Sequence, residues 1–225
     1  MKSKSAMRVW LVSFLLTMSV PSIGQSGGFT FVFLNKKSNA EKIPKDQSDK
    51  LMEGHMANIT RLASEGKLIA AGPFDGGGGI FVFNSNSIAQ VQEWVSTDPA
   101  VKANRWNVEI LPYSPMIGSI CKVGEPYEMV SYHFIRFWPQ IKKFNVEGSQ
   151  QLILAHEDYW KKQHEGKPHI TFASFGVEAG DILILGEPID ESVLMKDPAI
   201  GVGLMKFEKK VLWIARGSFC EKTEK

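Results

Sequence analysis

The stretch that decides the fold occurs twice: "STDPAVKANRWNVEILPY" spans residues 96–113, and "MKDPAIGVGLMKFEKKVLWI" spans residues 195–214. Each contains Asp-Pro-Ala followed by a β-branched residue, and each leads into a segment typical of a strand. Upstream of each lies a Glu-Gly-Lys, and further upstream a histidine, His55 or His156. These features keep their order and nearly their spacing, which indicates an internal duplication.

Both copies carry the same predicted elements. "GFTFVFL" at 28–34 is strand-like, and apolar residues at helical spacing predict a helix around His55 that ends at Gly66. Further strand-like and helical segments complete the order β-α-β-β-α-β, with a shorter second helix in the second copy. We therefore predict an α+β fold of two tandem ferredoxin-like units, in which each unit can cover the other's sheet.

The domain limits follow from this repeat. The first unit is expected over residues 28–113 and a second, divergent unit over residues 128–217. A stretch with two prolines and several small residues around Cys121 is the expected linker, over residues 114–127.

The first 24 residues have the layout of a secretory signal peptide. Lys2, Lys4 and Arg8 flank the start of an apolar run that ends at Val20, and small residues before Gly24 suit a cleavage point. An uncleaved membrane anchor is the alternative, although the run is shorter than the roughly 18 apolar residues that a transmembrane helix needs. We expect an exported protein, periplasmic or secreted, with no membrane association after cleavage.

The charge balance gives no case for nucleic acid. The chain has 26 basic and 24 acidic residues, and the first 24 positions hold three of the basic residues and none of the acidic ones. The mature chain therefore has a net charge of −1, so its slight basicity belongs to the export segment and not to a nucleic-acid-binding surface.

Cys121 and Cys220 are the two cysteines of the chain. In an oxidising compartment they can form one disulfide. Two reduced thiols are the alternative, because two cysteines carry no framework pattern.

The first copy resembles the YCII-related domain family, whose members are small dimeric α+β barrel proteins. The resemblance rests on His55, on "LASEGKLIAAGPF" with the glycines that follow it, and on "STDPAVKANRWNVEILPY". It covers residues 28–113 well and residues 128–216 more loosely. Family members pair a histidine of the first helix with the aspartate of the Asp-Pro step beside a cleft, and have been proposed as enzymes. The resemblance implies that the two units pack as a pseudo-dimeric α+β barrel. It also implies a His55–Asp98 pair here, with His156 and Asp197 as the second-copy equivalents.

The chemistry of such a pair is that of an oriented base. His55 lies on the apolar face of its predicted helix, where the N–H of a neutral imidazole needs an acceptor. A buried carboxylate such as Asp98 would accept it and fix the tautomer, as in a histidine that acts as a general base. The alternative is a core histidine with satisfied hydrogen bonds, and an Asp98 that only caps the turn before Pro99.

The glycine-rich stretch "GPFDGGGG" at 72–79 precedes a strand-like segment and not a helix, so it lacks the context of a phosphate-binding loop. We predict a hairpin, with Gly72 and Pro73 as substrate-binding residues at the rim of the cleft. The second copy has Ser174 and Phe175 at about these positions, which makes a second working pocket doubtful.

Other chemistries have little support. The one Gly-x-Ser-x-Gly pattern, at residues 24–28, lies beside the expected cleavage point and precedes a strand-like segment, so it is not the strand-to-helix elbow of a serine hydrolase. His156, His164 and His169 lack a recognised metal-ligand spacing. No metal or cofactor is expected. The expected function is a small-molecule enzyme, lyase- or hydrolase-like, that uses His55 and Asp98; the alternative is a non-catalytic small-ligand-binding or structural module. Because the two copies mimic a dimer, a monomer is expected.

Overall fold

The computed structural model describes residues 28–140, 142, 146–164 and 169–221, so the predicted signal segment lies outside the described residues. Two sets of elements follow one another along the chain, and we call them unit 1 and unit 2. Unit 1 comprises β1 (Phe29–Lys36), α1 (Lys45–Ser64), β2 (Leu68–Pro73), β3 (Gly79–Phe83), α2 (Ile88–Val95), α3 (Pro99–Lys102) and β4 (Trp106–Ile117). Unit 2 comprises β5 (Met129–Pro139), α4 (Val146–His164), β6 (His169–Ser174), β7 (Asp181–Leu185), α5 (Glu191–Met195), α6 (Pro198–Gly201) and β8 (Met205–Ala215). The predicted α+β fold is confirmed.

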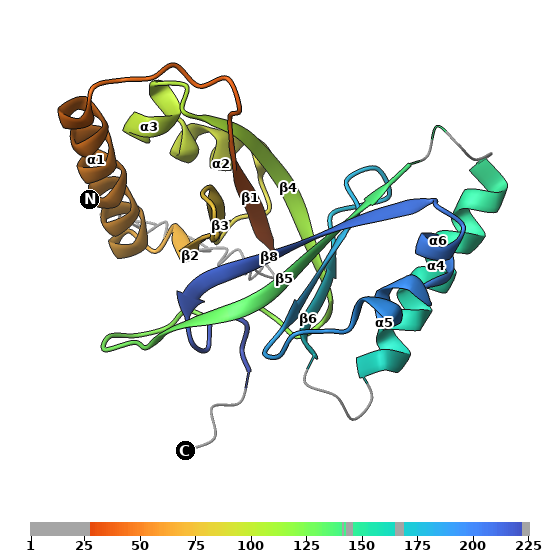
Figure 1. The fold of residues 1–225 in the computed structure, drawn as a ribbon. Coiled ribbons are helices and arrows are strands. Elements are labelled where there is room, and N and C mark those ends of the chain that lie inside the picture. Colours follow the sequence, from red (N-terminus) through yellow and green to blue (C-terminus); the bar gives the residue numbers. More distant parts are fainter. Residues whose placement is uncertain (1–27, 141, 143–145, 165–168, 222–225) are drawn as a thin grey trace, which may run out of the picture.

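All eight strands form one antiparallel sheet in the order β2-β3-β1-β4-β6-β7-β5-β8. The pairing of β4 with β6 joins the units, and the two edge strands also meet, because Phe74 forms a bridge with Leu212. The N–H of Asp75 donates to the carbonyl of Val211 at 2.9 Å beside that bridge. The sheet therefore closes into a barrel within one chain, and the helices of the two units lie on opposite outer sides of it (Figure 1).

Strand β4 is longer than the sequence indicates. It continues past Tyr113 to Ile117, so the linker expected over residues 114–127 begins only after the strand. The reason is tertiary, since Ser114 and Pro115 pair with Ser174 and Ala173 of β6. A strand that unites two units cannot be delimited from its own pattern alone.

Three apolar clusters hold the structure together. One lies between β1–β4 and the helices of unit 1, and one lies correspondingly in unit 2. The third draws on strands of both units and fills the barrel, with Phe31, Phe33, Phe134, Phe175 and Ile184 among its members. Each unit thus buries one sheet face under its own helices and the other against its neighbour, which removes both faces from water.

The registers of the paired strands show which residues of unit 1 and unit 2 occupy equivalent positions. Lys36 pairs with Trp106 in unit 1, and Pro139 pairs with Met205 in unit 2, so equivalent positions of β4 and β8 are 99 residues apart. Beyond these strands the same spacing relates "GSIC" at 118–121 to "GSFC" at 217–220.

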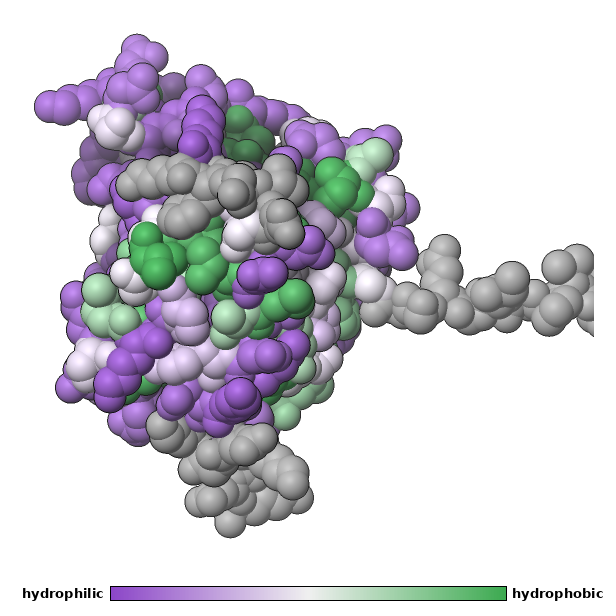
Figure 2. Space-filling view, turned by 90° about the vertical axis from the view of Figure 1, so that its right-hand side faces the viewer, coloured by the Kyte–Doolittle hydropathy of each residue, from purple (hydrophilic) through white to green (hydrophobic). Residues whose placement is uncertain are grey.

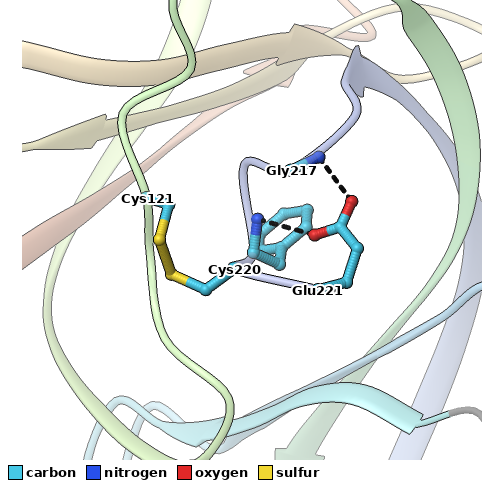
Figure 3. Close-up of a disulfide and its surroundings, with 5 residues drawn as sticks. Cys121, Gly217, Cys220 and Glu221 are labelled. Atoms are coloured by element: carbon cyan, nitrogen blue, oxygen red, sulfur yellow. Dashed lines mark hydrogen bonds between the residues drawn. A yellow bond between two sulfur atoms is a disulfide. The ribbon is translucent and has the colours of Figure 1, made fainter. Parts of the chain in front are cut away.

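Cys121 and Cys220 form a disulfide, and their sequence separation is that same 99 residues (Figure 3). The bridge therefore links equivalent positions of the two units. The carboxylate of Glu221 fastens the turn beside it by accepting from the backbone N–H of Gly217 at 2.5 Å and of Phe219 at 3.2 Å.

The outer face over the helices of unit 2 is largely hydrophilic, with apolar residues gathered in its middle (Figure 2). Leu154 of α4, Met195 of α5 and Val202 after α6 are more than half exposed. Within the described part of the chain, no helix combines the length and the apolar character that crossing a bilayer requires.

Candidate functional site

The structure brings His55 and Asp98 together. His55 lies on the buried face of α1, and Asp98 is the N-cap residue directly before α3. Nδ1 of His55 lies 2.7 Å from Oδ2 of Asp98, a hydrogen-bond distance that favours the tautomer with its hydrogen on Nδ1. That tautomer leaves the lone pair on Nε2.

The carboxylate of Asp98 is held in place by its role as a helix cap. Its Oδ1 accepts from the backbone N–H of Ala100 at 2.8 Å and of Val101 at 3.2 Å, which is the function of an N-cap aspartate. Asp98 is fully buried. Burial by itself raises the pKa of Asp98, but the hydrogen bond and charge of His55 and the two backbone N–H groups outweigh it, and the pKa lies below its ordinary value. Asp98 is therefore an ionised partner that does not move.

His55 is the accessible member of the pair. Its side chain is 11% exposed, and its ring stacks on Phe81 with centroids 5.8 Å apart. Among the described residues Nε2 has no hydrogen-bond partner, while Asn58 Nδ2 adds a long contact of 3.4 Å to Asp98 Oδ2. One nitrogen of His55 is thus fixed and the other is open, which is the arrangement of a general base or of a ligand-binding imidazole.

The second-copy residues His156 and Asp197 also come together, but in different surroundings. Nδ1 of His156 lies 2.5 Å from Oδ2 of Asp197, and Trp160 Nε1 donates to the same oxygen at 2.7 Å. On the other side, Nε2 lies 3.4 Å from Oδ2 of Asp181, within ion-pair range though not aligned as a hydrogen bond. His156 is fully buried.

This second histidine is held in its charged form. Burial by itself lowers the pKa of His156, but Asp181 and Asp197 on its two sides outweigh burial and raise the pKa to about 9. An imidazolium between two carboxylates has no lone pair to offer and no contact with solvent. The unit 2 group is therefore an internal ion cluster.

The difference between the two histidines comes from three equivalent positions on the strands beneath them. Leu34, Ala71 and Gly79 of unit 1 correspond by register to Phe137, Phe172 and Asp181 of unit 2. The rings of Phe137 and Phe172 lie 4.9 and 5.7 Å from the ring of His156. The larger side chains and the added carboxylate of unit 2 thus fill space around His156 that Leu34, Ala71 and Gly79 leave open around His55.

Sequence reasoning missed Asp181 and Trp160. A signal for Asp181 exists, because an aspartate stands at the start of "DILIL" where unit 1 has the glycine of "GIFVF". The sequence comparison set Gly72 and Pro73 against Ser174 and Phe175, and this is wrong by one position. Pro73 pairs with Gly79 and Ser174 pairs with Asp181, so the equivalents of Gly72 and Pro73 are Ala173 and Ser174.

Gly72 and Pro73 lie at the seam of the barrel. Gly72 is buried, and a Cβ on it would come within 2.5 Å of the carbonyl oxygen of Trp213 in β8. Pro73 is exposed and ends β2. A side chain at position 72 would clash with β8, so packing explains why this residue is a glycine.

A groove lies between the units, but neither His55 nor Asp98 lines it. It has a volume of about 670 Å³ and is bordered by the β2–β3 turn, the end of β1 and parts of β5 and β8. Across the residues that the structure describes, no group of three or more His, Cys, Asp or Glu side chains is arranged to hold a metal ion.

Comparison with known proteins finds a family model that matches unit 1. Residues 29–115 match the family model of the YCII-related domain, a match that covers unit 1 and stops before unit 2. No curated protein matches the chain.

Solved structures of similar outline exist. A candidate monooxygenase from Lactobacillus acidophilus NCFM aligns over 83% of this chain and 93% of its own, with 11% identity and a TM-score of 0.42. A candidate monooxygenase from Fusobacterium nucleatum subsp. nucleatum ATCC 25586 aligns over 85% and 94%, with 7% identity and a TM-score of 0.46. A candidate chlorite dismutase aligns over 84% and 94%, with 9% identity and a TM-score of 0.42. Likeness at this level says nothing about the reaction of this chain.

Proposed function

We propose that this protein is a small-molecule enzyme in which His55 transfers a proton through Nε2 while Asp98 fixes the ring. The observation that carries the proposal is the contrast between the two histidines. His55 has one nitrogen bound to a buried carboxylate and the other without a partner among the described residues, whereas His156 faces carboxylates on both sides. The match of unit 1 to the YCII-related domain supports the same assignment.

In this proposal the proton moves between substrate and Nε2 of His55. Asp98 stays ionised and stabilises the imidazolium that forms, because its Oδ2 already accepts the Nδ1–H hydrogen. Proton transfer of this kind suits a lyase or a hydrolase, in which a proton is removed from substrate carbon or from attacking water. Unit 2 supplies the other half of the barrel as a divergent copy of the same domain.

The test uses the mature protein and a panel of hydrolase and lyase substrates. With any substrate found, His55→Gln lowers kcat at least about 100-fold, since a positioned general base contributes roughly 10²–10⁴. Asp98→Asn, which keeps a capping oxygen, lowers kcat with little change in KM. Full turnover by the His55→Gln protein would contradict the proposal. If the variant binds a ligand as tightly as wild type and no substrate is turned over, the protein is a binding module.

We also propose that the protein is exported and loses residues 1–24. The disulfide between Cys121 and Cys220 supports this, because such bonds persist in oxidising compartments. Mass spectrometry of the protein from its producing cell should find an N-terminus near Gln25 outside the cytoplasm. A chain that keeps Met1 in the cytoplasm would contradict it.

A further inference from the structure

The barrel has two ends, which we call its mouths. They occupy equivalent places in the two units, but different residues line them. At one mouth, Arg136 of β5 is 4% exposed, and its guanidinium lies 4.0 Å over the ring of Phe33 and 5.1 Å from the ring of Trp138. Two hydrogen bonds of 2.7 Å join it to Glu109 of β4. Trp138 and Arg136 therefore occupy this mouth.

The other mouth is the groove of about 670 Å³. By register, Asn35 stands here at the position that Trp138 has in unit 2, and Phe33 at the position of Arg136. The smaller Asn35 leaves open the space that an indole fills at the first mouth. The volume falls within the range of small-molecule sites, roughly 300–1,000 Å³.

The lining of the groove is also more basic than its counterpart. Lys36, Lys209 and Lys210 line it, and their equivalents by register are Pro139, Ile110 and Leu111. Two carboxylates, Asp75 and Glu208, are the acidic groups of the lining. Three lysines against two carboxylates leave an excess of positive charge, which favours an anion.

The lysines are available to a ligand. The stem of Lys36 lies against Gly77, and no ion pair is found for its ammonium among the described residues. Lys209 and Lys210 pair with Glu191 and Glu208 at 3.1 Å in partly exposed positions. Partly exposed pairs of this kind contribute little stability. The Lys210 ammonium also lies 4.9 Å from the ring centroid of Phe74, so it is already placed at the wall of the groove where an anion would bind.

Apart from Asn35 and His133, the rest of the wall is largely apolar. Phe74, Phe134, Ile189 and Val211 line the groove, and Phe74 packs edge-on against Phe134 with centroids 5.0 Å apart. Gly76 and Gly77 form the turn above them, both with positive φ. The hairpin glycines thus let the chain pass close over the groove without side chains to fill it.

From this structure we infer that the groove binds a small organic anion, with a carboxylate, sulfonate or phosphate at Lys36 and Lys210 and an apolar body against Phe74 and Phe134. The site is distinct from the His55–Asp98 pair, which does not line the groove. This inference gives a binding role to the glycine-rich turn, which takes no part in the proposed proton transfer at His55.

The probe for the test is 8-anilinonaphthalene-1-sulfonate, an organic anion whose fluorescence rises on binding, with N-phenyl-1-naphthylamine as its uncharged analogue. Wild-type protein should bind one equivalent of the anion, at least tenfold more tightly than the uncharged analogue. Asn35→Trp, which installs the residue of the other mouth, should weaken binding at least tenfold. Lys36→Gln should weaken it about three- to tenfold.

Two controls separate the groove from other causes. Lys102→Gln removes a lysine that does not line the groove and should leave the affinity unchanged. His55→Gln should also leave it unchanged, so failure of the proton-transfer proposal and failure of this one are distinguishable. Equal affinity for the charged and uncharged probes, or equal effects of Lys36→Gln and Lys102→Gln, would overturn the inference. If Asn35→Trp does not fold, Lys36→Gln decides alone.

Discussion

The buried ion cluster of unit 2 makes the stability of the protein fall at mildly alkaline pH. His156 has a pKa of about 9 in the folded protein, against an ordinary value of about 6.5 in an unfolded chain. A raised folded pKa means that the native state holds the proton more tightly than the unfolded state. The stabilisation is therefore complete below pH 6.5 and is lost as the pH rises through about 9.

The size of this effect follows from the two pKa values. One pKa unit corresponds to about 1.4 kcal/mol, so the interval from 6.5 to about 9 corresponds to about 3 kcal/mol of unfolding free energy. For a domain of ordinary stability that is a large share of the total.

The assay is urea unfolding of the oxidised protein at pH 6.0 and pH 9.5, followed by tryptophan fluorescence. Wild type should lose about 3 kcal/mol between these conditions. His156→Asn should be less stable at pH 6.0 and nearly insensitive to pH, while the matched change in unit 1, His55→Asn, should keep the wild-type loss. If His156→Asn does not fold, Asp181→Asn should move the loss to lower pH. A flat wild-type profile, or an unchanged loss in His156→Asn, would refute the reasoning.

Three further outcomes concern the barrel. Replacing Cys121 and Cys220 by serine should lower the unfolding free energy by about 2–5 kcal/mol in urea, because the bridge closes a long loop; an unchanged midpoint would show that it does not constrain the unfolded chain. Gly72→Ala should cost about 1–3 kcal/mol, since its Cβ would meet the Trp213 carbonyl at 2.5 Å, whereas Lys102→Ala on an exposed helix should cost little. Light scattering should give the mass of one chain, because β2 and β8 close the barrel internally; a dimer mass would show that other surfaces associate.

Much of the fold could be predicted from the sequence because local patterns and the repeat agree. The helical spacing around His55 predicts its place on the apolar face of a helix, the resemblance to the YCII-related domain implies its pairing with Asp98, and the structure joins the two at 2.7 Å. The repeat carried the same expectation to His156 and Asp197. A short window of sequence contains each helix pattern and each Asp-Pro step, whereas their pairing is what the resemblance implies.

What could not be predicted depends on how strands pair across the molecule. Asp181 reaches His156 only because β7 lies beneath α4, and the groove is built from residues of both units. The extension of β4 needs β6 as its partner. The repeated "GSIC" and "GSFC" are present in the sequence. However, "GSIC" lies in a stretch rich in proline and glycine, which is typical of a linker, so its local pattern assigns it to the linker and not to the repeat.

The central claim is that His55 is a base with an open nitrogen, while His156 is a buried imidazolium. Nitrogen-15 NMR of the histidine side chains at pH 8 tests it most directly, because the shifts report which ring nitrogens carry hydrogen. The account predicts that neutral His55 is protonated at Nδ1 and bare at Nε2, and that His156 is protonated at both nitrogens. A neutral His55 with its hydrogen on Nε2, or a His156 with a bare nitrogen, would contradict it.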